Sequence, residues 1–329
     1  MSMRVDNATA AGEARRRAMS VARMLGFDDS HIGRVGIAVS EASSNMVKHA
    51  TGGRLVLQEL GEDGELGMAA LALDHGPGMA RPTEMMKDGA TTTGTMGGGL
   101  GAISRQASEF GLWTSQGGGT AVYAGFWPEA SPWRTTGLDV GAVCVPIEGE
   151  AVCGDAWAFH GGPERSSLLV VDGLGHGPLA HDAAQAAIET FRARVQRGPG
   201  DMLSDVHDAL RHTRGAAVAI AEFLPTRDLV RFAGAGNVAA SLIDKETVRH
   251  MISQFGTVGH RISRVHESQF PWPRGSHVVL HTDGLKGGWS LGEYPGIARC
   301  HPMILAGLLW RDHAREKDDA TVVVVGRPE

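Results

Sequence analysis

The spacing of apolar residues predicts alternating helices and strands through the first 127 residues. In Arg34–Ala50 the apolar residues recur every three or four positions, as on the buried face of an amphipathic helix. A glycine- and threonine-rich loop, Gly89–Gly101, interrupts the pattern further along. The expected helices are Ala8–Leu25, Arg34–Ala50 and Ala102–Phe110, and the expected strands are Arg54–Glu59, Leu66–Asp74, Gly111–Ser115 and Thr120–Phe126.

The remaining residues, from about Leu138 to Glu329, are richer in strand patterns, with helices inserted between them. This arrangement predicts an α+β fold with long antiparallel segments. The expected helices are Leu179–Val195, Asp201–His212 and Pro302–Glu316. The expected strands are Ala142–Pro146, Ser167–Val171, Ala216–Phe223, Leu229–Ala233, Ala239–Ile243, His277–His281 and Thr321–Val325.

A boundary between two domains is expected at Pro128–Thr136. This stretch, PEASPWRTT, combines two prolines with small polar residues and follows a predicted strand. The chain has 329 residues, a length that suits two domains. We therefore expect one domain over residues 1–127, a linker over 128–136 and a second domain over 137–329.

Composition narrows the classes of partner and location. The net charge of −6 disfavours nucleic acid and anionic membranes as partners, and no apolar run is long enough to span a bilayer. The first residues lack the apolar core of a secretory signal. The three cysteines are odd in number and lack CxxC spacing, so neither a disulfide framework nor a zinc site is indicated. We expect a cytoplasmic protein. Its chain is long enough to bury a hydrophobic core without disulfide bonds or structural metal ions.

Three motifs in the first domain suit nucleotide chemistry. Glu41 and Asn45 lie four residues apart on one helix face, away from its apolar stripe. Asp74–Gly78 (DHGPG) ends a strand, where an aspartate can accept a hydrogen bond from an adenine amino group and glycines let the backbone come close. Gly97–Gly101 (GGGLG) leads into a helix, whose free N–H groups favour phosphates. Singly these motifs are typical of turns, flexible loops and solvated faces.

The order of the three motifs resembles that of the GHKL ATPases, over Ala8–Trp127. The absence of a dimerisation helix points to the RsbT-like, anti-sigma switch kinases, which phosphorylate serine or threonine on small STAS-domain proteins. The resemblance implies a Bergerat α/β two-layer sandwich, with Glu41 as catalytic base and Asn45 as the Mg²⁺ ligand. It places the ATP contacts on Asn45, Asp74, Gly76, Gly78, Gly98, Gly99, Leu100, Gly101 and Thr120.

The contact to the γ-phosphate stays unassigned, because the glycine run contains no basic residue. Lys48 and Arg105 are the candidates, and the alternative for both is a solvated surface position.

In the second domain, aspartates fall at the ends of predicted strands. Asp155 is expected to follow a short strand, Asp172 and Asp283 follow apolar runs, and Asp318 with Asp319 precedes the last strand. Each alone suits a turn. Together they form an oxygen-only ligand set, which selects Mg²⁺ or Mn²⁺ over zinc. Two such ions could polarise a phosphate and generate a hydroxide nucleophile.

The segments GDAW, VVDGLGHG, HTDGL and DDATVVVV resemble those of the PPM phosphatases, in their SpoIIE branch and closest to the RsbX-like feedback phosphatases. The resemblance implies an αββα sandwich of antiparallel sheets. It makes Asp155 and Asp172 catalytic and assigns two Mn²⁺ or Mg²⁺ ions to Asp155, Asp172, Asp283 and Asp318, with the Gly173 carbonyl as a further ligand. Asp319 is the alternative to Asp318. His176 is interpreted as a loop residue, and the group that binds the substrate phosphate stays unassigned.

Three hypotheses for function follow. The leading one is a bifunctional regulator that phosphorylates and dephosphorylates STAS-domain antagonist proteins, with an anti-sigma or downstream switch protein as a further partner. The second is a phosphatase whose first domain only binds nucleotide and a partner such as a sigma factor. The third is a structural role, in which a degenerate nucleotide domain only dimerises. The sequence leaves the oligomeric state open.

Overall fold

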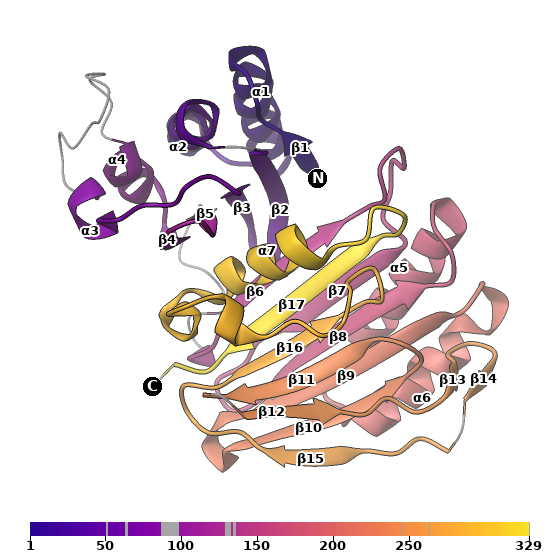
Figure 1. The fold of residues 1–329 in the computed structure, drawn as a ribbon. Helices are drawn as coiled ribbons and strands as arrows, with labels where there is room; N and C mark the ends of the chain where they lie inside the picture. Colours follow the sequence, from indigo (N-terminus) through magenta and orange to yellow (C-terminus); the bar gives the residue numbers. More distant parts are fainter. Residues whose placement is uncertain are drawn as a thin grey trace. The chain divides into compact units, whose positions relative to one another are not determined.

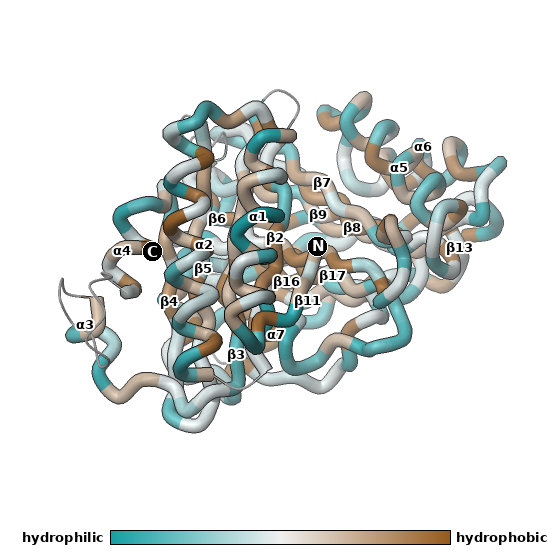
Figure 2. Tube along the Cα trace, turned by 90° about the horizontal axis from the view of Figure 1, so that it is seen from above, coloured by the Kyte–Doolittle hydropathy of each residue, from teal (hydrophilic) through white to brown (hydrophobic). Residues whose placement is uncertain are grey.

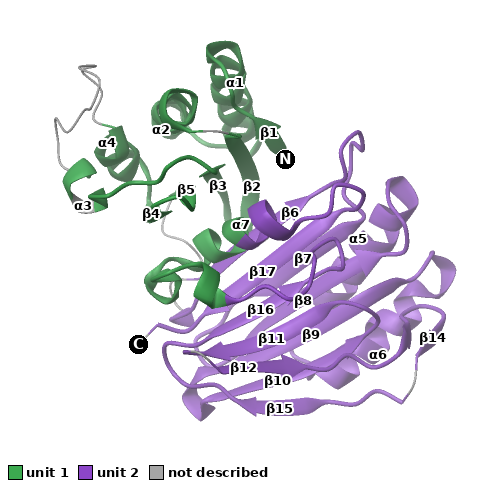
Figure 3. Ribbon diagram, viewed as in Figure 1, with its two compact units in different colours: residues 1–131, 291–308 green, residues 132–290, 309–329 purple. Residues whose placement is uncertain are grey.

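The chain forms two compact units, and we describe each by itself (Figure 3). Unit 1 comprises Met1–Ser131 and Leu291–Leu308, and unit 2 comprises Pro132–Ser290 and Leu309–Glu329. The computed structural model describes residues 1–50, 52–62, 65–86, 99–128, 133, 136–245, 247–262 and 264–328.

Unit 1 is built on an antiparallel five-stranded sheet of order β1-β2-β3-β5-β4 (Figure 1). Its strands are β1 (Ser2–Arg4), β2 (Arg54–Glu62), β3 (Glu65–Asp74), β4 (Glu109–Ser115) and β5 (Gly119–Phe126), and its helices are α1 (Ala8–Met24), α2 (Asp29–His49), α3 (Pro82–Met85) and α4 (Gly99–Gln106).

Local sequence fixes where the long helices of unit 1 begin. The side chain of Asn7 accepts a hydrogen bond from the Ala10 N–H, and that of Asp28 accepts one from the His31 N–H. Such caps satisfy N–H groups that a helix leaves unpaired. The Asp28 cap starts α2 at Asp29, five residues before the helix expected from the apolar pattern. α1 and α2 lie side by side, each with hydrophobic and hydrophilic residues (Figure 2).

The sheet of unit 1 is buried on both faces. Alternate residues of β3, such as Ala70 and Ala72, belong to the core under α1, α2 and α4. The residues between them face the segment Leu291–Leu308, where a β-carbon on Gly307 would lie 2.4 Å from the Leu71 side chain. On β4, the Trp113 indole N–H donates to the Pro295 carbonyl oxygen at 3.0 Å. A segment from the far end of the chain therefore completes this unit.

The helix expected at Ala102–Phe110 is shifted in the structure. α4 covers Gly99–Gln106, and the sequence then turns into β4 at Glu109. Phe110 is a strand residue, because it pairs with Ala124 of β5. The prediction of helix up to Phe110 was wrong at this end, where an aromatic residue suits a strand equally well.

Unit 2 contains two antiparallel five-stranded sheets, of order β15-β10-β9-β8-β7 and β12-β11-β16-β17-β6. The strands are β6 (Asp139–Val145), β7 (Asp155–His160), β8 (Ser166–Gly173), β9 (Ala216–Leu224), β10 (Leu229–Ala235), β11 (Ala239–Asp244), β12 (Thr247–Met251), β15 (Ser268–Pro271), β16 (His277–His281) and β17 (Ala320–Gly326), with a small hairpin of β13 (Gly256–Thr257) and β14 (Arg261–Ile262). The helices are α5 (Pro178–Ala193), α6 (Pro199–Ala209) and α7 (Pro302–His313), which runs from unit 1 into unit 2.

Helices α5 and α6 cover one face of the first sheet of unit 2. Their buried residues, including Ala184, Ile188 and Leu203, pack with Val171 and Ile220 of the strands. The β7–β8 and β6–β17 pairs bring the ends of both sheets together at the start of β7. The αββα expectation is met by these antiparallel layers.

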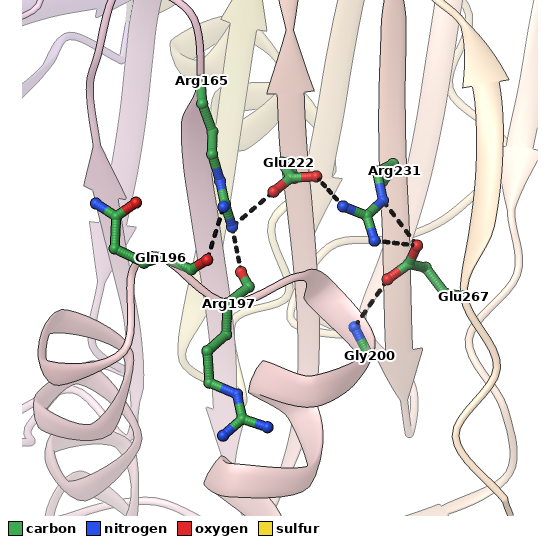
Figure 4. A network of polar contacts seen from close by, with 7 residues as sticks. All are labelled: Arg165, Gln196, Arg197, Gly200, Glu222, Arg231 and Glu267. Carbon is green, nitrogen blue, oxygen red and sulfur yellow. Dashed lines mark hydrogen bonds and ion pairs between the residues drawn. The ribbon is translucent and has the colours of Figure 1, made fainter.

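A network of ion pairs and hydrogen bonds links the first sheet of unit 2 to the connection between α5 and α6 (Figure 4). Glu222 of β9 is buried and accepts from Arg231 at 2.7 Å, while Arg165 lies 2.6 Å away on its other side. Arg165 also donates to the Gln196 and Arg197 carbonyl oxygens. A buried carboxylate needs such partners, so this network is structural.

Across the described ranges, no helix has both the length and the apolar character needed to cross a membrane. The strongly buried α7, for example, has 12 residues, against about 20 for a spanning helix.

Candidate functional sites

Unit 1 contains a cavity of about 500 Å³ beneath α2, α4 and the strand ends. Seven of the residues selected from the motifs line it. They are Glu41, Asn45, Asp74, Gly78, Gly99, Leu100 and Thr120. A cavity of this size suits a small-molecule ligand with apolar and charged parts.

Glu41 and Asn45 lie one helical turn apart on α2, and both are half-buried at the cavity wall. Their spacing puts them on the same side of the helix, opposite the buried Val39 and Val35. This arrangement places a carboxylate and an amide side chain one helical turn apart at the cavity wall. It matches what a hydroxyl substrate and a hard cation would require.

Asp74 ends β3 and is 9% exposed. Its Oδ1 accepts from the Gly76 N–H at 2.7 Å and the Thr120 N–H at 3.2 Å. Thr120 is the residue opposite Asp74 in the β3–β5 register. These two bonds fix the orientation of the carboxylate at the cavity wall.

The glycines after Asp74 are required by the protein's own backbone. Gly78 has a φ of +72°, and a β-carbon there would lie 2.0 Å from the Ser115 carbonyl oxygen. A β-carbon on Gly76 would lie 2.9 Å from Asp74 Oδ1. Close packing of this turn on the strand end accounts for both, in addition to the approach to a ligand that the sequence suggested.

Only part of the second glycine motif, Gly97–Gly101, lines the cavity. Gly98 lies outside the described residues. Gly99 and Leu100 line the cavity, whereas Gly101 is buried within α4 and, like Gly76, does not.

Among the described residues, Lys48 and Arg81 bring lysine and arginine side chains to the cavity wall, and His49 also lines it. Lys48 was a sequence candidate, whereas Arg81 was missed because it precedes the four-residue α3, which carries no recognisable motif. Arg105 is exposed on α4 and is not among the cavity residues. The candidates for contact with phosphate are therefore Lys48 and Arg81.

In unit 2 the aspartates gather where the two sheets meet, and we call Asp155, Asp172, Asp283, Asp318 and Asp319 the acid edge. Asp155 pairs directly with Asp172 in the β7–β8 register. Asp155 begins β7, which corrects the expectation that it follows a strand. The next strand of the sheet, β9, puts Ala217 opposite Asp172.

Thr282 links the two sheets at this edge. Its hydroxyl donates to Asp155 Oδ2 at 2.7 Å and accepts from the Thr321 N–H at 3.0 Å. Sequence reasoning overlooked Thr282, although it sits in the HTDG segment beside Asp283. On the other side, the Asn237 amide donates to Asp283 Oδ2 at 2.6 Å.

Asp318 and Asp319, which the sequence could not separate, have different surroundings. Asp319 is 2% exposed, and its two oxygens accept from the Ile147 and Gly154 N–H groups, both at 2.7 Å. Asp318 is half-buried and its Oδ1 accepts from the Asp319 N–H at 3.0 Å. Asp319 therefore ties the loop before β7 to the start of β17, and Asp318 is the better placed to bind a cation.

Burial and repulsion between charges raise the pKa of three carboxyls at the acid edge, those of Asp155, Asp172 and Asp318. Burial, followed by the charges of Asp155 and Asp283, raises the pKa of Asp172 to about 8. Burial raises the pKa of Asp155 well above its usual range, and burial and Asp283 raise that of Asp318. Such repulsion is relieved when cations lie between the carboxylates.

Within the described part of the chain, no three His, Cys, Asp or Glu side chains converge tightly enough to enclose a metal ion. The donor chemistry nevertheless fits one, since the gathered groups are all carboxylates. Gly173 is buried beside them, held by a bond from its N–H to the Gly154 carbonyl oxygen. His176 is exposed in the following loop, with Nδ1 2.7 Å from Glu150 Oε1.

Comparison with known proteins identifies both halves. The family model for a histidine kinase-like ATPase domain matches residues 5–126, and that for stage II sporulation protein E (SpoIIE) matches residues 162–289. The second match includes Asp172 and Asp283. The fold and sites thus define a protein that joins a kinase-like ATPase domain to a phosphatase domain.

Individual relatives support this assignment of the two halves. The chain is 33% identical over 114 residues to the serine/threonine-protein kinase RsbT of Bacillus subtilis, which covers 35% of the chain and 86% of RsbT. It is 22% identical over 139 residues to the phosphoserine phosphatase RsbX of the same organism, covering 42% of the chain and 70% of RsbX. A structure solved in work on the bacterial stressosome as a modular system for secondary-messenger signalling matches with 27% identity and a TM-score of 0.53, over 57% of the chain and 98% of that protein.

The chain therefore belongs to the RsbT family of switch serine/threonine kinases, and its second half is a phosphatase domain of the SpoIIE type. It is a bifunctional regulator of the partner-switching kind.

Proposed function

We propose that this regulator adds phosphate to, and removes it from, serine or threonine of a STAS-domain antagonist protein. The observation that carries the proposal is the presence in one chain of a cavity with paired Glu41 and Asn45 and an edge of gathered aspartates. The similarity of the two halves to a kinase and to a phosphoserine phosphatase supports it. Joining opposing activities raises the concentration of each near a shared partner.

For phosphorylation, we assign ATP to the cavity of unit 1. Asp74 would accept from the adenine amino group, with Gly76, Gly78 and Thr120 around it. Asn45 would hold Mg²⁺, and the start of α4 would face the phosphates. Glu41 would orient the attacking hydroxyl and take its proton. Lys48 and Arg81 at the wall offer positive charge to the phosphates.

For dephosphorylation, we assign two Mn²⁺ or Mg²⁺ ions to the acid edge. Asp155, Asp172, Asp283, Asp318 and the Gly173 carbonyl would hold them. Bound there, the ions would supply a hydroxide nucleophile and a charge that polarises the phosphate. Thr282 orients Asp155 through its 2.7 Å bond, and Asn237 orients Asp283.

The test follows a STAS-domain protein by intact-mass spectrometry in both directions. With ATP and Mg²⁺ the wild type is expected to add one phosphate, and with Mn²⁺ and no nucleotide it is expected to remove one. Glu41→Ala should abolish only the first reaction and Asp172→Ala only the second, so each variant is the other's control. Unchanged phosphorylation by Glu41→Ala would refute the kinase assignment, and unchanged dephosphorylation by Asp172→Ala the phosphatase assignment. ATP binding without transfer would favour the alternative, a nucleotide-binding domain that holds a partner such as a sigma factor.

A further inference from the structure

We propose that Arg214 binds the phosphate group of the phosphoprotein substrate at the acid edge. The inference rests on the phosphatase assignment and supplies the phosphate-binding residue that the sequence left unassigned. Its basis is the position of Arg214 two residues before β9, beside the loop that follows Asp172.

Backbone pairing brings Arg214 next to that loop. Asp172 and Gly173 lie opposite Ala217 and Ala216 in the β8–β9 register. One step further, the Leu174 N–H donates to the Gly215 carbonyl oxygen at 3.0 Å. The two chain segments therefore continue side by side past the ends of their strands, so that residues 214 and 175 are neighbours.

The guanidinium of Arg214 lies against Gly175. A β-carbon on Gly175 would be 3.1 Å from Arg214 Nη1, and Gly175 has a φ of +84°. Any larger residue there would push against the guanidinium. The positive charge therefore lies next to the backbone of Gly175, three residues beyond Asp172.

The backbone that carries Arg214 is fixed on both sides. The Gly215 N–H donates to the Thr213 hydroxyl at 3.0 Å, and that hydroxyl donates to the Leu210 carbonyl oxygen at 2.8 Å. His260 Nε2 donates to the Arg214 carbonyl oxygen at 2.8 Å. An arginine on a fixed backbone loses less freedom when it binds an anion, which favours affinity.

The side chain of Arg214 is exposed and, among the described residues, has no carboxylate or hydrogen-bond partner of its own. Three arginines of unit 2 are by contrast used in ion pairs within the fold: Arg165 and Arg231 share Glu222, and Arg327 pairs with Asp228. The planar guanidinium can bind two phosphate oxygens at once. An arginine without a carboxylate partner, next to the loop that follows Asp172, is well suited to attract a dianion.

The experiment compares Arg214→Gln with the wild type, using p-nitrophenyl phosphate as substrate, Mn²⁺ as the metal and inorganic phosphate as inhibitor. The inhibition constant for phosphate and the KM are expected to rise roughly tenfold, as for loss of a charge-assisted hydrogen bond. The Mn²⁺ concentration for half-maximal activity and the melting temperature should stay unchanged. Arg214→Lys, which keeps the charge but not the fork, should fall between.

The matched control is Arg211→Gln, three residues earlier. Arg211 is also exposed, but its guanidinium pairs with Asp208 at 2.8 Å. It should behave as the wild type. An Arg214→Gln protein with unchanged phosphate inhibition would overturn the proposal, and so would a parallel shift in the Mn²⁺ requirement, which would make Arg214 a support for the metal ligands.

A direct binding measurement separates this proposal from the phosphatase assignment. Inorganic phosphate is titrated calorimetrically into the Mn²⁺-loaded wild type and Arg214→Gln. Weaker binding by the variant supports Arg214, and equal or absent binding in both overturns it. A wild type that hydrolyses neither p-nitrophenyl phosphate nor a phosphorylated STAS protein would refute the phosphatase assignment, whatever the binding result.

Discussion

The cavity of unit 1 and the acid edge of unit 2 use charge in different ways. Around the cavity, Glu41 and Asp74 are accompanied by Lys48 and Arg81, so both signs of charge surround a hollow of about 500 Å³. At the acid edge carboxylates gather, and burial together with the charges of Asp155 and Asp283 raises the pKa of Asp172 to about 8. The cavity is shaped for a molecule that brings its own charges. The edge requires added cations before an anionic substrate can approach.

This difference predicts that the two activities separate cleanly by mutation and by metal. Changes at the acid edge should alter metal affinity and dephosphorylation and leave nucleotide binding alone. Changes in the cavity should do the reverse.

Asp172→Asn is expected to lower the rate of dephosphorylation by roughly a thousandfold or more, since metal-ion catalysis supplies several kcal/mol. Mn²⁺ affinity, measured by calorimetry, should fall with it. ATP binding to the same variant is the internal control. If ATP affinity changed together with Mn²⁺ affinity, the two sites would not be independent.

Glu41→Gln is expected to slow phosphorylation of a STAS protein by about a hundredfold or more, as for loss of a general base. The amide keeps the size of the side chain, so ATP affinity should stay near that of the wild type. Single-turnover transfer followed by mass spectrometry measures the rate. A variant as fast as the wild type would remove Glu41 from the chemistry.

Asp319→Asn and Asp318→Asn should have opposite phenotypes. Asp319 accepts from two backbone N–H groups in a buried position, so its amide variant should lose about 3 kcal/mol of unfolding free energy. Asp318→Asn should fold normally and bind Mn²⁺ more weakly. Urea unfolding and metal titration on both variants provide the comparison. A reversal of the two phenotypes would exchange their roles.

His301 tests the packing of Leu291–Leu308 within unit 1. It stacks on Tyr123 with ring centroids 4.6 Å apart, its Nδ1 accepts from the Met303 N–H, and Glu109 lies 3.9 Å from Nε2. Burial lowers the pKa of His301 to about 4. The unfolded chain binds a proton near pH 6.5 that the folded state does not, so stability falls as pH decreases.

Between pH 7 and pH 5 the unfolding free energy should fall by about 1 kcal/mol because of His301. The effect is smaller than for a fully buried group, because the imidazole keeps some contact with water. Urea unfolding at the two pH values measures the loss. His301→Asn should show a smaller difference between them, though with lower stability overall. An equal difference would mean that His301 is solvated and protonates in the folded state.

Much of this architecture could be predicted from the sequence, because the spacing of apolar residues follows the buried face of each helix or strand. The β16 range His277–His281 and most other strands were found within a few residues of their predicted bounds. The motifs of unit 1 converge on one cavity, with Gly98 outside the described residues. β7 was missed as a strand, since its residues Asp155–His160 follow a loop with no turn signal beyond Gly154.

Contacts between segments far apart in the chain could not be predicted from the sequence. The run Pro302–Trp310 is almost wholly apolar, which indicates burial on all sides without naming the neighbours. Only the structure shows its first part against β3 and β4. Likewise, the roles of Asp318 and Asp319 depend on which carboxylate faces Ile147 and Gly154, residues more than 160 positions earlier.

In the proposed scheme, phosphate leaves the substrate at the acid edge by attack of water, independently of the kinase cavity. Dephosphorylation of a phosphorylated STAS protein in ¹⁸O-labelled water, with Mn²⁺ and no nucleotide, follows the source of the attacking oxygen. We predict that the released phosphate gains one ¹⁸O atom, with the same result for Glu41→Gln. Dephosphorylation that required ADP and produced ATP would contradict the account, because the phosphate would then leave by reversal of the kinase reaction.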